Sequence, residues 1–196
     1  MKTTNKLLTL IIIFSSLFSL QSQNKFSKRK IENLKEEVSQ LVEDDKKMTQ
    51  VMIDKVFSFG ELGFQEFETS KYLGKILEEN GFDVEYQISD IPTSWLATWS
   101  NGEGGPTIAL GSDFDGVPST SQYPGVAYEK PVVEGAPGHG EGHNIGLPIV
   151  ITSAIAIKKI MIENNINGKL VLWPGVAEEI LGAKAWYVRD GYFDNV

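Results

Sequence analysis

The seven residues 138–144, GHGEGHN, contain both histidines of the 196-residue chain. His139 and His143 stand four residues apart with Glu141 midway between them, and glycines separate the three side chains. Imidazole nitrogens and carboxylate oxygens are common ligands of zinc and related metals, and glycine leaves the backbone free to aim them at one point. We therefore interpret this segment as a metal-binding loop. It differs from the helical H-E-x-x-H motif, because its glutamate is central and glycines disfavour a helix.

Two pairs of acidic residues add oxygen ligands to this histidine loop. Asp113 and Asp115 follow one predicted strand, and Glu178 and Glu179 follow another. Taken singly, each pair has an ordinary explanation, because aspartates form turns and glutamates stabilise the first turn of a helix. Ligands nevertheless collect at the carboxyl edge of open α/β sheets. The order of the three clusters along the chain therefore predicts that they meet at one site.

The elements that must position these side chains alternate between helices and strands. Helical periodicity covers residues 27–57 and a second segment that stops at Asn80 and Gly81. Short apolar runs predict strands at 84–88, 95–99, 107–111 and 168–173, and longer patterns predict helices at 147–165 and from Ala177 onward. This alternation indicates the α/β class, with a mixed, largely parallel sheet and helices on both faces. The aperiodic segment 116–140 is long for a loop in a compact domain, which is typical of a functional loop.

Composition restricts the partners and the compartment. The chain has a formal net charge of -8 and no cysteine, so we expect neither nucleic acid nor an anionic membrane surface as a partner. Residues 1–23 have the pattern of a signal peptide, with an uncleaved N-terminal anchor as the alternative. An exported protein, periplasmic or secreted, is therefore expected, with no membrane contact beyond the export signal. We divide the remainder into a helical segment, 24–57, and a catalytic domain portion, 58–196.

Four segments in the same order resemble one known family. They are ELGFQEFETS at 61–70, GSDFDGVPSTSQ at 111–122, PGHGEGHNIG at 137–146 and GVAEEILGAK at 175–184. Together they resemble the metal-dependent amidohydrolases of the aminoacylase and glutamate-carboxypeptidase family, nearest the branch that hydrolyses p-aminobenzoyl-glutamate. The resemblance implies an α/β catalytic domain with two divalent metal ions, zinc in the first place and manganese as the alternative. It also implies a small-molecule amide or dipeptide substrate, and a homodimer for a full-length form.

The resemblance also implies a role for each candidate residue. Glu178 corresponds to the general base, which is a catalytic residue, and Glu179 to the metal ligand beside it. His143 corresponds to a second ligand, and Glu141 occupies the position where this branch commonly has a ligating cysteine. Asp115 is expected to serve catalysis by orienting or tuning the metal site. The remaining two residues are assigned less closely: Asp113 stands where other branches have histidine, and His139 is expected to contact the substrate or to lie outside the metal ligands.

Two departures from the family pattern qualify these expectations. Glu141 replaces soft sulfur with hard oxygen, which favours manganese alongside zinc. The chain also has no histidine after His143, so two metal ions would lack ligands, and we expect the N-terminal portion of a longer hydrolase. The alternative is a truncated, non-catalytic domain that binds a metal or another ligand. A plain α/β domain with acidic surface clusters is the third reading, which the four ordered segments disfavour.

Overall fold

A computed structural model describes residues 26–196, which divide into two compact units between Lys35 and Glu36. The first unit contains the start of helix α2 (Lys28–Asp44), where Ser27 Oγ accepts the backbone N–H of Lys30 at 3.2 Å. The second unit contains the remainder of α2 and all other elements. The signal peptide expected at residues 1–23 lies outside the described residues.

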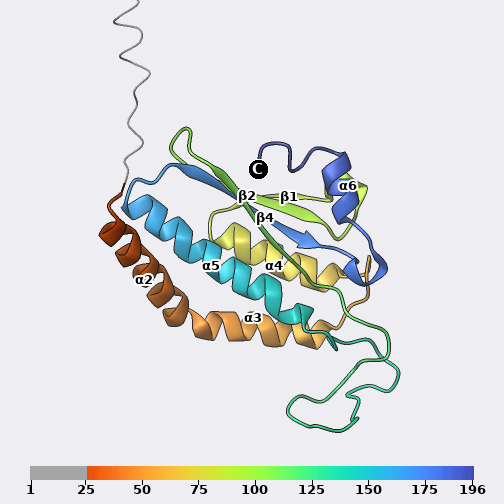
Figure 1. Ribbon diagram of the computed structural model, residues 1–196. Coiled ribbons are helices and arrows are strands. Elements are labelled where there is room, and N and C mark those ends of the chain that lie inside the picture. Colours follow the sequence, from red (N-terminus) through yellow and green to blue (C-terminus); the bar gives the residue numbers. More distant parts are fainter. Residues whose placement is uncertain (1–25) are drawn as a thin grey trace, which may run out of the picture. The chain divides into compact units, whose positions relative to one another are not determined.

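A four-stranded sheet forms the centre of the second unit (Figure 1). Its strands are β1 (Asp83–Tyr86), β2 (Trp95–Asn101), β3 (Thr107–Asp113) and β4 (Gly168–Gly175), arranged in the order β1-β2-β4-β3. The pairs β1–β2 and β2–β4 are antiparallel, and β3–β4 is parallel. The mixed α/β class is thus confirmed, but the expectation of a largely parallel sheet is wrong. Parallel neighbours need a long crossover, and among the described strands only β3 and β4 are joined by one that contains a long helix.

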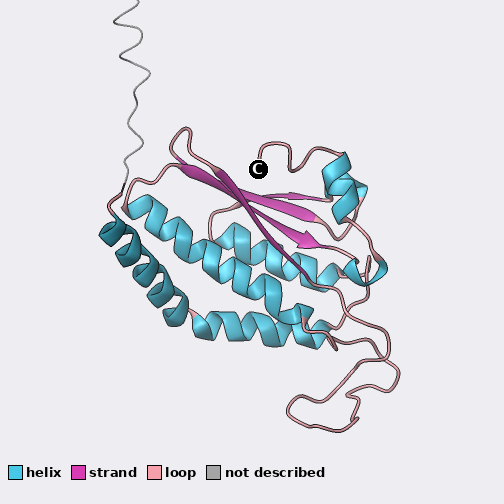
Figure 2. Ribbon diagram, in the orientation of Figure 1, coloured by secondary structure: helices cyan, strands magenta, loops and turns pink. Residues whose placement is uncertain are grey.

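Helices lie on both faces of this sheet, as expected (Figure 2). Helices α4 (Phe67–Glu79) and α5 (His143–Glu163) cover one face, and α3 (Lys46–Phe59) packs against their outer side. A hydrogen bond of 2.8 Å between the hydroxyls of Thr49 and Thr152 joins α3 to α5. On the other side of the sheet lies the short helix α6 (Lys184–Arg189).

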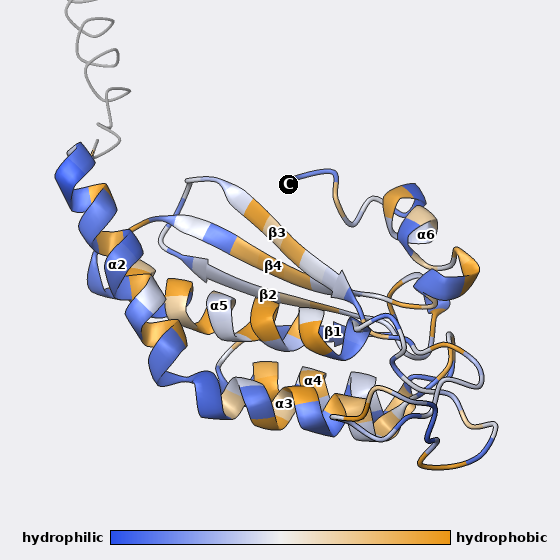
Figure 3. Cartoon of the chain, turned by 60° about the horizontal axis from the view of Figure 1, so that its bottom comes forward, coloured by the Kyte–Doolittle hydropathy of each residue, from blue (hydrophilic) through white to orange (hydrophobic). Residues whose placement is uncertain are grey.

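Helix α5 is the central helix of the core. Within residues 26–196 it is the one helix whose length and composition would allow it to cross a membrane. Its residues Leu147, Ile151 and Ala154 are, however, fully buried in the same core cluster as Leu172 of β4. Hydrophobic residues accordingly concentrate in α5, β3 and β4 (Figure 3). Burial between the sheet and α3 accounts for the apolar residues on the inner side of α5, whereas Ile145, Ile149 and Ile162 are exposed.

The largest differences from the sequence-based expectation lie in three helical segments. The helical segment 27–57 forms two helices, because the chain turns at Asp45. Helix α5 begins at His143, four residues before the expected start, and Gly142 caps it with a φ of 104°. The helix expected from Ala177 forms only a 3-10 turn, η2 (Glu178–Ile180), before α6, because Ala177 and Leu181 both have left-handed backbone conformations.

Candidate metal centre

Three segments bring acidic and histidine side chains to one edge of the sheet. Strands β3 and β4 are parallel neighbours in which Asp113 pairs with Gly175, so the residues that follow both strands lie at the same edge. Helix α5 starts at this edge with His143, so the positive, N-terminal end of its dipole lies beside the acidic residues. The arrangement explains how residues far apart in the sequence can form one cluster.

His143 stands at the centre of the cluster, surrounded by carboxylates. Its ring nitrogen Nδ1 lies 3.3 Å from Glu141 Oε1, 3.4 Å from Asp115 Oδ1 and 3.9 Å from Glu179 Oε1. Potential ligand atoms of Glu141, His143 and Glu179 all lie within 4.8 Å of one another. The predicted convergence of these four side chains is therefore found. Carboxylates packed this closely repel each other unless a cation or protons neutralise them.

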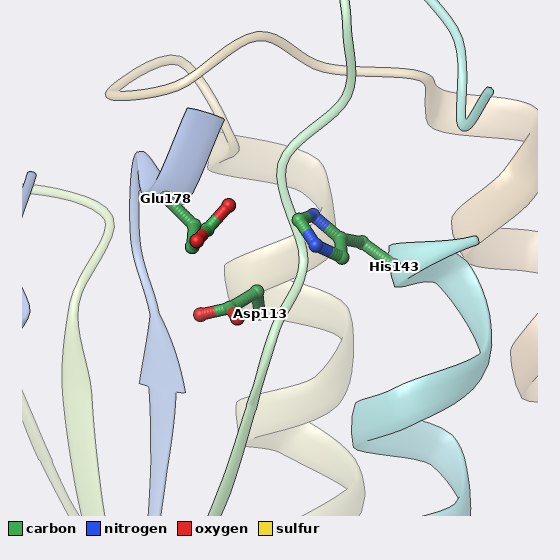
Figure 4. A group of neighbouring side chains, drawn as sticks. All are labelled: Asp113, His143 and Glu178. Carbon is green, nitrogen blue, oxygen red and sulfur yellow. The ribbon is translucent and has the colours of Figure 1, made fainter. Parts of the chain in front are cut away.

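A second group shares the same histidine. Asp113, His143 and Glu178 also offer atoms within 4.8 Å of one another, and a ring nitrogen of His143 faces both carboxylates (Figure 4). Nδ1 of His143 lies 3.1 Å from the main-chain oxygen of Asp115. A carbonyl oxygen only accepts hydrogen bonds, so this contact places the proton on Nδ1 and leaves Nε2 with a lone pair. His143 thus has one nitrogen held by the protein and one available to a ligand, as metal-binding histidines commonly do.

Asp113 has a contact that the sequence did not reveal. Its Oδ1 lies 2.7 Å from Nζ of Lys184 at the start of α6. The close approach depends on Gly175, because a Cβ at that position would overlap Asp113 Oδ1. One oxygen of Asp113 is therefore neutralised by a lysine. This gives the residue a partner within the protein beside its place in the candidate site.

His139 lies beside the cluster with its side chain fully buried. Its Nε2 is 3.2 Å from the main-chain oxygen of Val56 and therefore donates, so the neutral ring has its lone pair on Nδ1. That Nδ1 lies 3.5 Å from Glu141 Oε1 and has no hydrogen-bond partner. Burial lowers the pKa of His139, although the neighbouring Glu141 opposes this shift. The neutral form is thus favoured, and its unpaired nitrogen faces the loop that carries Glu141.

The acidic residues differ in exposure and in what holds them. Asp115 is fully buried, and its Oδ2 accepts the backbone N–H of Glu179 at 3.0 Å. Glu141 Oε1 accepts the backbone N–H of His143 at 2.9 Å. Burial raises the pKa of Glu179, and Glu141, Asp115 and Glu178 raise it further, while His143 lowers it. The charged form of Glu179 is thus less favoured than that of a free glutamate, although the residue is exposed to solvent.

These observations test whether the residues fit a divalent cation. Buried polar atoms are nearly always hydrogen-bonded, yet Asp115 Oδ1 and His139 Nδ1 have no such partner. Both atoms border the group of Glu141, His143 and Glu179. A set of oxygen and imidazole donors with unused lone pairs, placed around a surplus of negative charge, is what a divalent metal requires. The residues present fit such an ion.

Sequence reasoning missed one residue at this edge, Glu66. This side chain is fully buried; its Oε1 accepts the backbone N–H of Ala177 at 2.9 Å, and its Oε2 accepts the hydroxyl of Thr93 at 2.8 Å. Burial raises the pKa of Glu66, although these hydrogen bonds oppose the shift. The only available signal was its place within the segment 61–70. The family resemblance includes this segment but assigns no role to this glutamate.

Comparisons with known proteins place these features in context. No protein-family model matches the chain. One of the subunits of the p-aminobenzoyl-glutamate hydrolase of Escherichia coli is 31% identical over 159 residues, which are 81% of this chain and 33% of that protein. Hippurate hydrolase of Campylobacter jejuni is 32% identical over 137 residues, which are 69% of this chain and 33% of that protein. The chain thus spans about a third of the length of these relatives.

Solved structures share the fold. A dinuclear metal-binding peptidase of the M20 family from Bacillus subtilis matches 78% of this chain and 42% of its own, with a TM-score of 0.63 and 24% identity. An aminobenzoyl-glutamate utilization protein from Klebsiella pneumoniae matches 82% of this chain and 44% of its own, with a TM-score of 0.56 and 17% identity. At these identities the likeness establishes the fold of the α/β domain.

Proposed function

Since the chain belongs to the M20 family of metal-dependent amidohydrolases and peptidases, we propose that it takes part in the hydrolysis of an amide bond. The substrate class would be an N-acyl or N-aroyl amino acid, p-aminobenzoyl-glutamate among them, or a dipeptide. The observation that carries the proposal is the convergence of Glu141, His143 and Glu179, whose potential ligand atoms all lie within 4.8 Å of one another. The names of the relatives in E. coli and C. jejuni support the same substrate class.

Glu141, His143 and Glu179, with Asp115 beside them, would supply ligands to a pair of divalent metal ions, which would need further ligands than these residues provide. When bound, such ions polarise the amide carbonyl and lower the pKa of water. Zinc is proposed first, because imidazole and carboxylate donors suit it, and manganese second, because Glu141 supplies a hard oxygen. Asp113 and Glu178 lie close to the same His143, and their carboxylates would add negative charge around the metal ions.

Glu178 is proposed as the general base. Its half-buried carboxylate lies with Asp113 and His143 at the edge of the sheet (Figure 4). As the oxygen of a water molecule adds to the amide carbon, Glu178 takes a proton from that water. It then gives the proton to the amide nitrogen while the carbon–nitrogen bond breaks, which releases an amine and a carboxylic acid. Glu179 is less suited to this duty, because a carboxylate that binds a metal loses basicity.

A hollow beside Glu141 would accommodate the acyl or aroyl group. It has a volume of about 670 Å³, and its apolar walls are formed by Phe57, Pro124 and Ile145. Asp54 and Asn144 add polar atoms to the same lining. An apolar hollow with a few polar groups next to reactive residues is the usual form of a small-molecule site. We therefore assign the apolar end of the substrate to this side of the cluster.

A non-catalytic domain that binds a metal or another ligand is the second candidate. The small number of potential metal ligands favours this candidate, because the sequence contains only two histidines, both in the loop 138–144. This candidate predicts metal binding without hydrolysis. Export and a homodimeric longer form stay separate predictions, which rest on residues 1–23 and on the family resemblance respectively.

The decisive experiment measures metal binding and hydrolysis on the same protein. The purified chain is loaded with zinc or manganese, its metal content is determined, and release of amine from p-aminobenzoyl-glutamate and from hippurate is followed. We expect metal binding and metal-dependent release from at least one substrate, with Glu178→Gln as an inactive, metal-binding control. Metal binding with no hydrolysis would favour the non-catalytic candidate. Absence of metal binding would overturn the hydrolase and would leave, of the second candidate, only a domain that binds another ligand.

A further inference from the structure

The backbone on either side of Glu178 is held by two buried carboxylates. Glu66 Oε1 accepts the N–H of Ala177 at 2.9 Å, and Asp115 Oδ2 accepts the N–H of Glu179 at 3.0 Å. Glu66 comes from the start of α4 and Asp115 from the end of β3, and neither side chain reaches solvent. Two elements far apart in sequence therefore hydrogen-bond to the same turn, residues 177–179, one on each side of Glu178.

The turn that they hold has an unusual conformation. Ala177 has φ 53° and ψ 43°, which is the left-handed region that residues with a side chain rarely adopt. Its carbonyl oxygen accepts the N–H of Gly182 at 2.8 Å, which closes the turn behind Glu178 and Glu179. A Cβ at Gly63 would lie 2.9 Å from Ala177 Cα, so this segment also packs tightly against the turn. Such a conformation persists only where its surroundings over-determine it.

Stability alone gives a poor account of Glu66. A carboxyl group removed from water loses hydration, and no ion pair to Glu66 is found within residues 26–196. The hydrogen-bond donors to its carboxylate, among them the hydroxyl of Thr93 and the N–H of Ala177, are neutral. An apolar side chain would fill the same space without this cost, but it would leave the Ala177 N–H without an acceptor. Glu66 instead fixes the direction in which the backbone continues after β4, because its carboxylate holds the N–H of Ala177.

We propose that Glu66 is a positioning residue that, together with Asp115, sets the placement of Glu178 and Glu179 at the candidate metal centre. The inference rests on the proposed function. Loss of the Glu66 acceptor would free Ala177 to leave its left-handed conformation, and Glu179 would move away from His143, which it now approaches to 3.9 Å. Groups that orient a metal ligand typically change metal affinity by about 10–100-fold when they are removed.

Three variants separate positioning from simple destabilisation. Glu66→Gln keeps an oxygen acceptor for the Ala177 N–H, and its amide group can donate to the hydroxyl of Thr93. Glu66→Asp keeps the charge, but it is one methylene shorter and cannot reach both partners. Leu77→Ala, at the other end of α4, removes a fully buried side chain from the core without touching the turn. It serves as the matched control for lost stability.

Two measurements are made on each variant and on the unaltered chain: manganese affinity by calorimetry, and hydrogen exchange of the Ala177 and Glu179 amides by NMR. We expect Glu66→Asp to lose about 10–100-fold in affinity and to lose protection of the Ala177 amide selectively. Glu66→Gln should stay within about threefold of the unaltered chain on the same scale, and Leu77→Ala should lower the melting temperature without changing the affinity.

The outcomes distinguish this inference from the proposed function. Unchanged affinity together with unchanged Ala177 protection in Glu66→Asp would overturn the positioning role. So would an equal loss of affinity in Leu77→Ala, since that result reports stability alone. If the unaltered chain binds no manganese or zinc, the proposed function fails, and amide exchange still decides whether Glu66 holds the turn. If Glu66→Asp does not fold, selective loss of affinity in Thr93→Val, which removes the other partner of Glu66, supports the role, and unchanged affinity there overturns it.

Discussion

Asp115 contacts both His143 and the backbone of Glu179, one with each carboxylate oxygen. Oδ1 lies 3.4 Å from His143 Nδ1, and Oδ2 accepts the Glu179 N–H at 3.0 Å. Because the side chain is fully buried, its position is set by these contacts and by the end of β3. Asp115 therefore links a candidate ligand on α5 with one that follows β4, and its effect on metal binding should be large for a residue that is not itself the proposed ligand.

We predict that Asp115→Asn weakens metal binding while the fold is retained. Asparagine keeps the size and an acceptor for the Glu179 N–H, but it removes the charge beside His143. The expected loss in zinc or manganese affinity is about 10–100-fold, measured by competition with a chromogenic chelator. Asp83→Asn on the exposed edge strand β1 is the matched control. Equal affinity in both variants would contradict the linking role of Asp115.

Gly175 should resist substitution because of Asp113. A Cβ at Gly175 would overlap Asp113 Oδ1 and would lie 2.9 Å from Cε of Lys184. We expect Gly175→Ala to cost about 1–3 kcal/mol of unfolding free energy, the usual scale of overpacking. The double variant Asp113→Ala with Gly175→Ala should lose less than the sum of the single losses, because it removes the clashing oxygen. Strict additivity in urea unfolding would show that the two positions are independent.

Much of this site can be predicted from the sequence, because apolar runs mark the ends of strands and the carboxyl ends of parallel strands meet at the same edge of a sheet. The positions of Asp113, Asp115, Glu178 and Glu179 after apolar runs were sufficient to expect that they would meet near His143. The mixed sheet was less predictable, since the chain inserts β4 between β2 and β3, and nothing in the local pattern specifies that order.

Long-range hydrogen bonds explain the remaining differences. The bond from Thr93 to Glu66 spans 27 residues, and the bond from Ala177 to Glu66 spans 111 residues. Hydrophobic periodicity in the sequence does not predict contacts between such distant residues. The segment from Ala177 also has the composition of a helix. Tertiary hydrogen bonds and close packing at Gly63 instead impose left-handed geometry on Ala177. The sequence therefore predicted which side chains meet at this edge of the sheet, and the structure showed which hydrogen bonds hold the backbone around them.

Glu66 should make the stability of the chain depend on pH. Burial raises its pKa in the folded state above the ordinary value of 4.5. Between these two values the folded chain retains the proton while the unfolded chain has released it, so the free energy of unfolding falls as the pH rises through this window. Urea unfolding from about pH 4.5 to about pH 8 should therefore show Glu66→Gln gaining stability relative to the unaltered chain as the pH rises. A constant difference across this range would mean that Glu66 is not shifted.

The edge strand β3 should promote self-association. It lies at one end of the described sheet, carries no charge before Asp113, and exposes 46% of Ile108. The opposite edge, β1, is shorter and carries Asp83 and Glu85, which discourage edge pairing. We expect Ile108→Lys to lower the apparent mass at high concentration in analytical ultracentrifugation. Val51→Lys, at a similarly exposed position on α3, should not. A monomeric unaltered chain would contradict this prediction.

Glu178 and Glu179 are adjacent, yet in a full-length enzyme their variants should fail in different ways. Glu178→Gln keeps size and polarity but removes the proton acceptor, so metal content should stay constant while hydrolysis falls by about 100-fold or more. Glu179→Gln replaces a charged ligand with a weak neutral one, so metal content should fall together with activity, and excess zinc or manganese should restore part of both. Metal analysis of the two purified variants, beside their rates on p-aminobenzoyl-glutamate or hippurate, checks the assignment. Because Glu178 also lies near His143 and Asp113, the reverse pattern is a real test: metal loss in Glu178→Gln with metal retained in Glu179→Gln would exchange the two roles.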